Sequence, residues 1–171
     1  MEINIRIREL REQDIWILHK WVNDPEIIKY TNSFRPISEM EQREWMNNTR
    51  YFRNNYIFGI ENEAEGNILG ICGLYNFDVI ARNAELRMKI GDRAYHGQGV
   101  GTKALKLLLE YGYQNVNLHK IWLKVLANNK AAIRLYENAG FFKEGILREE
   151  MFIKGCYHDV YLMSLLENEY S

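Results

Sequence analysis

Residues 84–112 read AELRMKIGDRAYHGQGVGTKALKLLLEYG and join two different patterns through a glycine-rich turn. Apolar and charged residues alternate from Ala84 to Ile90, which predicts a strand with one buried face. From Val100 onward the apolar residues recur at helical spacing, so we expect a helix that runs to about Asn115. The stretch therefore predicts a strand, a turn and a helix of an α/β protein.

The glycine turn, residues 96–102, reads HGQGVGT. Consecutive backbone N–H groups at such a turn, beside a helix N-terminus, form a seat for phosphate, and glycine lets the phosphate approach the backbone. The glycine spacing differs from the dinucleotide-binding fingerprint, and the turn lacks the Lys-Ser/Thr ending of a P-loop. Both of those sites are therefore excluded. The alternative to an anion site is a plain tight turn with flexible glycines.

The first part of the chain predicts a strand followed by two helices. Isoleucines at alternate positions over residues 3–7 predict a strand with one buried face. Apolar residues at helical spacing over 12–22 predict a first helix, which ends at an Asn-Asp-Pro sequence. Ser38 and Glu41 fit a capping box, so we expect a second helix that reaches about Arg50.

The remaining patterns complete a mixed α/β order. They predict strands over 56–62, 67–75, 121–125, 141–147 and 151–166, and a helix over 130–139. The first half reads as antiparallel, whereas the second half has strand-helix-strand crossovers. We therefore expect a single α/β domain over residues 1–171, with a mixed central sheet of about six to seven strands flanked by about four helices.

Composition excludes several classes of protein. The chain of 171 residues has 22 Lys and Arg against 23 Asp and Glu, so it lacks the overall basic field that would attract nucleic acid or an anionic membrane. Its first residues show no secretory signal pattern and no stretch is long enough to span a bilayer, so we expect a cytoplasmic protein. Cys72 and Cys156 lack the spacing of a metal site or a disulfide framework, so we expect reduced thiols and no metal.

Two segments resemble the GNAT superfamily of N-acetyltransferases. The family signature in the glycine turn is Arg or Gln, two residues, Gly, one residue, then Gly or Ala; His96, Gly99 and Gly101 stand at these positions, and His96 departs from the pattern. Residues 117–145 read NLHKIWLKVLANNKAAIRLYENAGFFKEG, which is similar to the fifth strand, asparagine turn and fourth helix of the family. The resemblance spans nearly the whole chain and is strongest to the branch of ribosomal-protein and spermidine acetyltransferases.

The resemblance implies acetyl-CoA as co-substrate and a set of residues that bind it. The glycine turn would hold the pyrophosphate, the backbone of residues 88–90 would pair with the pantetheine arm as an added strand does, and Asn129 would contact that arm. The implied cofactor-binding residues are Met88, Lys89, Ile90, His96, Gly97, Gln98, Gly99, Val100, Gly101, Thr102 and Asn129.

Two residues match the catalytic positions of the family. Tyr136 stands where relatives carry the tyrosine that protonates the CoA sulfur; the alternative is a core aromatic, because apolar residues flank it on the same helix. Glu85 stands where relatives carry a glutamate that accepts the amine proton, often through water; the alternative is a solvated strand carboxylate. Cys72 has no base beside it in the sequence, and Cys156 lies near His158 but without an orienting group, which is a weak signal for a covalent route. We therefore expect direct transfer in a ternary complex.

The acceptor is the least determined part of the function. Residues 27–44 lack the dense acidic cluster with which spermidine acetyltransferases hold a polycation, whereas Arg35, Arg50 and Arg53 suit an anionic part of an acceptor or a plain surface role. We therefore expect acetyl transfer to a primary amine of a small molecule, such as an amino sugar. The alternatives are a ribosomal-type protein N-terminus, a polyamine, or a non-catalytic acyl-CoA-binding module. The oligomeric state stays open, and a homo-oligomer is one option.

Overall fold

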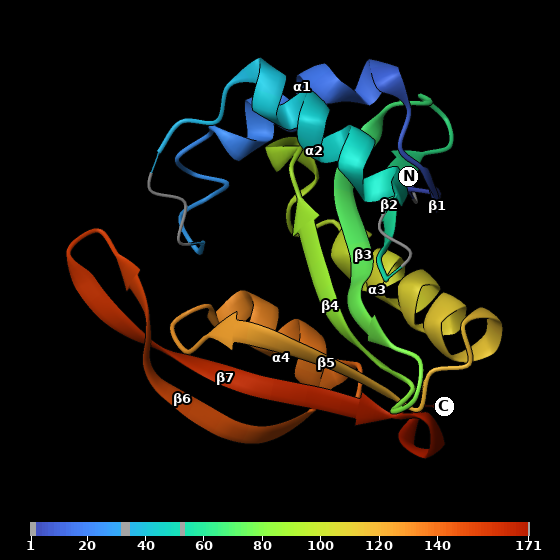
Figure 1. Ribbon diagram of the computed structural model, residues 1–171, viewed down its shortest axis with the longest axis vertical. Coiled ribbons are helices and arrows are strands. Elements are labelled where there is room, and N and C mark those ends of the chain that lie inside the picture. The colour runs from blue at the N-terminus through green and yellow to red at the C-terminus, as the bar shows by residue number, and fades with distance from the viewer. Residues whose placement is uncertain (1–2, 32–34, 52–53, 171) are drawn as a thin grey trace.

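One seven-stranded sheet organises the chain (Figure 1). The computed structural model describes residues 3–31, 35–51 and 54–170, and only the backbone at 50 and 51. The strands are β1 (Ile5–Glu9), β2 (Tyr56–Asn62), β3 (Ile68–Asp78), β4 (Asn83–Ile90), β5 (Lys120–Leu126), β6 (Phe142–Ile153) and β7 (Cys156–Leu166). The α-helices are α1 (Ile15–Val22), α2 (Glu39–Tyr51), α3 (Val100–Glu110) and α4 (Lys130–Asn138). The predicted α/β fold is confirmed.

The sheet opens at its centre, between β4 and β5. Its strand order is β1-β2-β3-β4-β5-β7-β6, and β4–β5 is the parallel pair among antiparallel ones. The two strands pair from Asn83 to Glu85 on β4 and from Lys120 to Trp122 on β5, while β4 stays paired with β3 up to Ile90. Figure 1 shows β4 rising away from β5 and β7 beyond this point. The β4–β5 opening therefore exposes a strand edge in mid-sheet.

Helices cover the two faces of the sheet with separate cores. Buried residues of α3 pack with those of the central strands in the larger cluster, which includes Leu74, Leu86 and Leu108. The helices α1 and α2 meet in the smaller cluster, whose largest member is Trp21. A Cβ at Gly91 would lie 2.0 Å from Cδ2 of Trp21, so only glycine lets α1 pack against the chain directly after β4.

At the helix ends, one local prediction agrees with the structure and one differs from it. Ser38 N donates to Glu41 Oε2 at 2.9 Å and Glu41 N donates to Ser38 Oγ at 3.2 Å, which confirms the capping box. The predicted helix from Val100 to Asn115 ends instead at Glu110, and a π-helical turn continues to Asn115. No helix among the described residues is long and apolar enough to cross a membrane.

Two strands differ from the sequence prediction. β6 continues through the predicted gap at 148–150, because a bulge between Leu147 and Met151, with Glu149 at φ 53°, keeps it paired with β7. On the polar face of β1, Arg8 is also buried: it is 8% exposed, donates from Nη1 to Asp14 Oδ2 at 2.7 Å and pairs with Glu61. The alternating pattern predicts an exposed side chain for Arg8. It cannot reveal the burial, because the partners Asp14 and Glu61 lie outside the strand.

Candidate active site

The glycine turn presents backbone amides at the start of α3. Gly97 and Gly99 have φ of 74° and 80°, in the left-handed region that favours glycine, and a Cβ on either would meet no atom within 4 Å. The helix begins at Val100, so the amides of residues 100–102 have no acceptor within the helix. The turn therefore offers N–H donors without an acceptor inside the helix, at the positive end of the helix, which suits a phosphate.

Gly101 marks where three elements of the site converge. A Cβ at this position would lie 3.7 Å from Leu135 Cδ2 on α4 and 4.0 Å from Ile90 Cγ1 on β4. These are ordinary van der Waals distances, so the protein itself leaves room for a larger residue at position 101. The start of α3, the end of β4 and the residue next to Tyr136 therefore lie around the same point.

Side chains of the turn fold back onto its backbone. His96 Nε2 lies 2.9 Å from the Ile90 carbonyl oxygen, which can only accept, so Nε2 carries the proton. Gln98 Nε2 donates to the Ala94 carbonyl, and Asp92 Oδ1 accepts from Ala94 N at 3.0 Å. These bonds fix the loop between β4 and α3 without using the amides of the helix start.

The exposed edge of β4 carries the backbone groups of alternate residues. Gly91 N donates to Leu69 O on the β3 side, so the Ile90 carbonyl points the other way, toward the β4–β5 opening. By the same alternation Met88 presents its N–H and C=O to the opening, whereas those of Lys89 point to β3. Of the predicted segment 88–90, Met88 and the Ile90 N–H are therefore the groups placed to pair with an added chain.

Asn129 is the N-cap of α4. Its Oδ1 accepts from Ala132 N at 3.3 Å, and its own N–H donates to Leu126 O at 2.9 Å. The oxygen of the side chain thus has a structural role. Its amide nitrogen is the group that can donate to a ligand.

Tyr136 combines a packed ring with an accessible hydroxyl. The side chain is 7% exposed, and its ring lies 5.6 Å from that of Phe141. Burial raises the pKa of Tyr136 to about 12, so the phenol stays protonated at neutral pH. Within the described chain this hydroxyl has no hydrogen-bond partner, and no fully buried side-chain polar atom lacks one, so the oxygen reaches solvent. Tyr136 can therefore pack its ring in the core and still offer its hydroxyl as a proton donor.

Glu85 is a buried carboxylate with two defined partners, not a solvated one. It lies on β4 opposite Trp122, at the last paired position before the β4–β5 opening, and is 8% exposed. Asn76 Nδ2 donates to Glu85 Oε2 at 3.1 Å, and Arg87 Nη2 donates to the same oxygen at 2.7 Å. Asn76 reaches it from a bulge of β3, where its φ is 55°. No local sequence pattern signals that contact.

The charged face of β4 consists of Glu85, Arg87 and Lys89, which point to the same side of the sheet as Tyr75. The Arg87 guanidinium carbon lies 4.8 Å from the centroid of the Tyr75 ring. Lys89 is half-buried, and desolvation by burial lowers its pKa. Sequence reasoning named Lys89 for its backbone alone and gave the Arg87 side chain no role, although strict alternation from residue 84 to 90 places all three side chains together.

The other candidates fall outside this constellation. Arg35 Nη2 pairs with Glu41 Oε1 at 2.6 Å, while the Arg50 side chain and all of Arg53 lie outside the described residues. Cys72 is buried, which raises its pKa to about 12, so this thiol is a poor nucleophile. Cys156 is exposed on β7. In the described ranges no group of three metal-binding side chains occurs.

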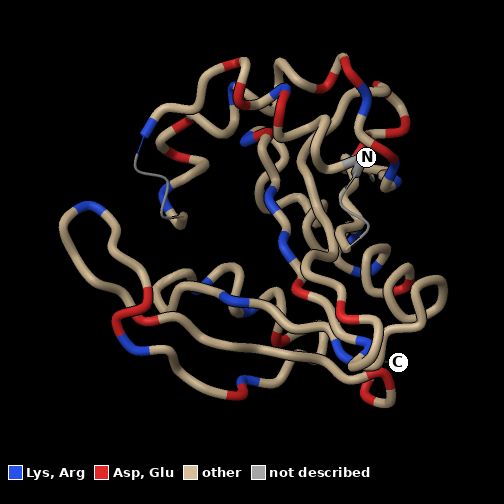
Figure 2. The backbone as a smooth tube through the Cα atoms, in the orientation of Figure 1, with Lys and Arg blue, Asp and Glu red and all other residues tan. Residues whose placement is uncertain are grey.

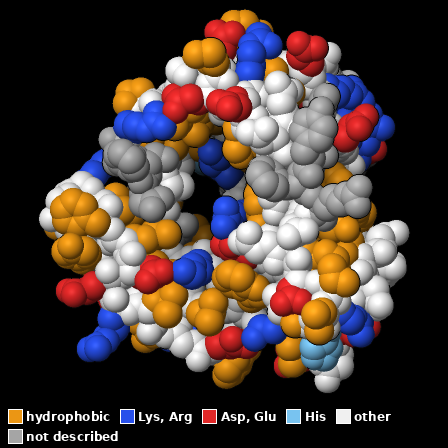
Figure 3. All heavy atoms as spheres, in the orientation of Figure 1, with side chains coloured by type: hydrophobic (Ala, Val, Ile, Leu, Met, Phe, Trp, Pro, Cys, Tyr) orange, Lys and Arg blue, Asp and Glu red, His pale blue; other side chains and the backbone are white. Residues whose placement is uncertain are grey.

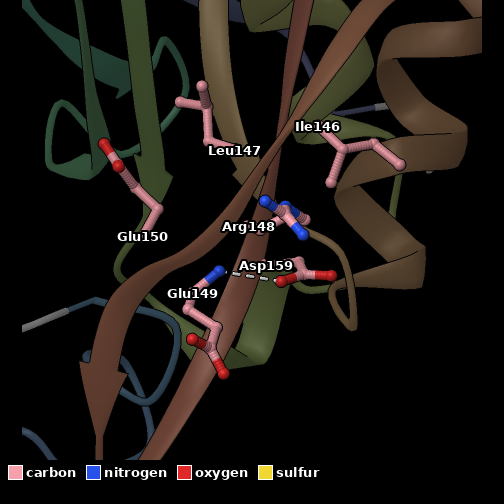
Figure 4. A pocket seen from close by; sticks show the side chains of 6 residues that line it. All are labelled: Ile146, Leu147, Arg148, Glu149, Glu150 and Asp159. Atoms are coloured by element: carbon pink, nitrogen blue, oxygen red, sulfur yellow. Dashed lines mark hydrogen bonds between the residues drawn. The ribbon is translucent and has the colours of Figure 1, made fainter.

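A separate hollow of about 710 Å³ lies at the bulge of β6 (Figure 4). Its lining residues are Ile146, Leu147, Arg148, Glu149, Glu150 and Asp159. Glu149 N donates to Asp159 Oδ1 at 2.8 Å across the bulge, as the dashed line shows. The hollow contains none of the predicted site residues, so the glycine turn and the β4–β5 opening define the candidate site.

Comparison with known proteins agrees with this geometry. The model of the acetyltransferase (GNAT) domain matches residues 4–142. The chain belongs to the GNAT acetyltransferase family. Spermidine N(1)-acetyltransferase of Vibrio cholerae is 31% identical over 170 residues, which cover 99% of this chain and 97% of that protein. The putative ribosomal N-acetyltransferase YdaF of Bacillus subtilis is 28% identical over 106 residues, 62% of this chain and 61% of that one.

A solved structure of the family shows the same fold. The crystal structure of the Vibrio cholerae spermidine N-acetyltransferase in complex with CoA and spermine has a TM-score of 0.91 and 32% identity, and the match covers 97% of both chains. The predicted family, enzyme class and co-substrate are thereby confirmed: this GNAT protein is an acetyl-CoA-dependent N-acetyltransferase.

Proposed function

We propose that this GNAT enzyme transfers the acetyl group of acetyl-CoA directly to a primary amine of a small molecule. The observation that carries the proposal is the convergence at Gly101, where the helix start, the end of β4 and α4 lie within contact distance. A phosphate-binding turn, an exposed strand edge, a buried carboxylate and a protonated phenol all belong to these elements. The acyl transfer needs each of them.

The turn and the strand edge would position acetyl-CoA. Free amides of the glycine turn bind the pyrophosphate, and the outward backbone groups of Met88 and Ile90 pair with the pantetheine arm in the β4–β5 opening. The amide nitrogen of Asn129 donates to the same arm. Support comes from the residues themselves: Gly97 and Gly99 are left-handed, exposed and unpacked, so they serve no internal packing purpose.

Tyr136 and Glu85 would move the two protons of the reaction. Glu85 accepts a proton from the attacking amine, directly or through water, and Tyr136 donates one to the departing thiolate. Because the pKa of Tyr136 is raised to about 12, the phenol needs no prior activation to act as a donor. The raised pKa of the Cys72 thiol, about 12, disfavours a covalent acyl-enzyme route and supports direct attack.

Three classes of acceptor have support, which differs in strength. A small metabolite such as an amino sugar agrees with the absence of an acidic cluster in residues 27–44. A polyamine is the second candidate, because a relative with 31% identity over almost the full length is a spermidine N(1)-acetyltransferase. A protein N-terminus has weaker support, from the shorter match to a putative ribosomal N-acetyltransferase.

A thiol-release assay with acetyl-CoA tests the proposal. The panel contains an amino sugar, spermidine, and a short peptide with a free N-terminus, each checked by mass spectrometry for the acetylated product. With the amino sugar, we expect thiol release to be faster than the hydrolysis of acetyl-CoA in the absence of an amine. Spermidine as the best acceptor would support the polyamine candidate. CoA binding without release for every amine would contradict catalysis and favour an acyl-CoA-binding module.

A further inference from the structure

We propose that Arg87 and Lys89 bind an anionic group of the acceptor, a carboxylate or a phosphate, and so select an acidic or zwitterionic primary amine over a polycation. This inference rests on the proposed transfer reaction and specifies its substrate class. Both residues belong to the charged face of β4, two and four positions beyond Glu85. An acceptor whose amine meets Glu85 would place its remainder along these two side chains.

The two cations lie where β4 has separated from β5. Pairing between the strands ends at Glu85, so Arg87 and Lys89 stand beside the β4–β5 opening. Figure 2 shows the Lys and Arg positions along this part of β4. Figure 3 shows a hollow in the same face of the molecule, with Lys and Arg side chains at its edge. The Arg87 side chain is exposed and that of Lys89 is half-buried, so both cations reach solvent.

Arg87 is held in place but keeps most of its donors. The Tyr75 ring supports the guanidinium at 4.8 Å, and Glu85 accepts one hydrogen bond from Nη2 at 2.7 Å. The side chain is nevertheless 56% exposed. A guanidinium has five N–H donors in a rigid fork, so its other donors can bind a carboxylate or phosphate without further ordering of the side chain. This is a preorganised anion contact.

Lys89 is a half-buried cation without a counter-charge. In the described chain no carboxylate lies within ion-pair distance of its ammonium group, whereas Arg87 is paired with Glu85. Its register partner is Ile71, which packs against the apolar cluster of α1 and α2. Removal of water from one side raises the cost of that charge, which agrees with the lowered pKa of Lys89. An anion in the opening would supply the missing partner.

The charge balance of this face argues against a polycation. Glu85 and Arg87 compensate one another, so Lys89 leaves the charged face of β4 with one unbalanced positive charge. In and just before α2, Glu41 is paired with Arg35, and Glu39 is paired with Arg43. A second ammonium group beside Lys89 would meet like charge in a partly desolvated site. This expectation differs from the activity named for the Vibrio cholerae relative.

Acceptors matched in length test the inference. We compare 5-aminopentanoate, 5-aminopentan-1-ol, cadaverine and 4-aminobutylphosphonate, which present an anionic, neutral, cationic or phosphonate end at nearly the same distance from the amine. The readout is kcat/KM for thiol release at saturating acetyl-CoA. We expect the better anionic acceptor to exceed cadaverine by at least about tenfold, the effect of roughly one charge contact. The carboxylate and phosphonate arms show which anion fits.

Lys89→Met assigns the preference to the site. The variant should lower about tenfold the ratio of kcat/KM for the anionic acceptor to kcat/KM for the neutral alcohol. Lys106→Met, on the exposed surface of α3, is the matched control and should change neither value. Arg87→Lys keeps the charge but loses the fork, and it should reduce the preference without abolishing it.

Failure of the inference can be told apart from failure of the proposed function. If thiol is released but cadaverine equals or exceeds the anionic acceptors in wild type, the inference is overturned while amine acetylation stands. If only larger amines are acetylated, the same four compounds are compared as competitive inhibitors, and equal inhibition constants overturn it. If no amine in either panel releases thiol although CoA binds, the proposed function fails and the inference falls with it.

Discussion

The glycine turn and the charged face of β4 start from the same strand but recognise ligands by different means. In the turn the binding groups are backbone amides, freed by left-handed glycines and by the helix start at Val100. On the charged face they are side chains, and residues of β3 hold two of the three: Asn76 donates to Glu85, and the Tyr75 ring supports Arg87. Recognition by the turn therefore depends on backbone geometry, whereas recognition by the charged face depends on which side chains stand at residues 85, 87 and 89.

Replacement of Tyr136 by Phe should have the largest effect, because this side chain of α4 would serve the reacting sulfur whichever acceptor the charged face binds. Tyr136→Phe keeps the ring against Phe141 and removes the donor. Turnover should fall by roughly ten- to ten-thousand-fold, the range of one general acid. The melting temperature and the CoA affinity should change little. Single-turnover kinetics with a saturating amine isolate the chemical step from product release.

The pH profile of wild type sharpens this test. Since burial raises the pKa of Tyr136 to about 12, the phenol should remain a proton donor throughout pH 6–10, and no loss of rate in that range should depend on this residue. Single-turnover rates of Tyr136→Phe equal to those of wild type would leave the tyrosine as core packing and assign the proton to water.

Loss of the Glu85 carboxylate should have the next largest effect. Glu85→Gln retains the hydrogen-bond acceptor for Asn76 and Arg87 but cannot take up a proton. We expect kcat/KM to fall by roughly a hundredfold near neutral pH. The loss should be greatest at low pH, where little of the acceptor amine is already neutral, and should shrink as the pH approaches the pKa of the amine.

The pH–rate profile decides between catalysis and structure for Glu85. A variant profile parallel to that of wild type would show that the carboxylate does not accept the amine proton. Arg87→Gln is the matched variant: it removes the ion pair and keeps the carboxylate, so it should retain the pH dependence that Glu85→Gln loses.

A methyl group at Gly101 should test the turn without strain. The Cβ of Gly101→Ala would sit at 3.7 Å from Leu135, and alanine favours the helix by about 0.5–1 kcal/mol, so the fold should be as stable or more stable. Because the family signature has Gly or Ala at this position, Gly101→Ala should bind CoA as wild type does. The bulky side chain of Gly101→Leu should instead keep the pyrophosphate from the first-turn amides, and we expect its CoA dissociation constant in calorimetry to rise by about tenfold, or about 1.4 kcal/mol.

Gly145→Ala provides the control for the turn. A Cβ at Gly145, on β6, would also meet no unfavourable contact, but the residue is far from α3 in the fold. That variant should bind CoA as wild type does. Unchanged affinity in Gly101→Leu would remove the helix start from the binding site, although the separate strand edge at Met88 would remain a candidate.

What the sequence could predict follows the same division. The turn, the strand before it and the helix after it are encoded by neighbouring residues, so their positions were foreseen within a few residues. The contacts of Glu85 with Asn76 and of Arg8 with Glu61 were not, because these partners are 9 and 53 residues away and pair only once the sheet has formed. The continuous β6 was missed for a related reason: its bulge is maintained by pairing with β7.

Loss of the ion pair between Arg35 and Glu41 should have the smallest effect, and this effect concerns the stability of the fold. The side-chain hydrogen bond from Arg35, with those from Ser38, lowers the pKa of Glu41 to about 2. A carboxylate whose pKa is lower in the folded state stabilises the fold above its unfolded pKa of about 4.3, and this contribution is lost as the pH falls through the folded value.

Glu41→Gln keeps the capping-box acceptor for Ser38 N but removes the charge. We expect a melting temperature slightly below that of wild type at pH 7, with the difference vanishing toward pH 2, while Glu44→Gln, an exposed position on the same helix, should show no such pH-dependent difference. NMR titration of the Glu41 carboxyl measures the pKa directly; an ordinary value near 4.3 would mean that the ion pair with Arg35 does not form in solution.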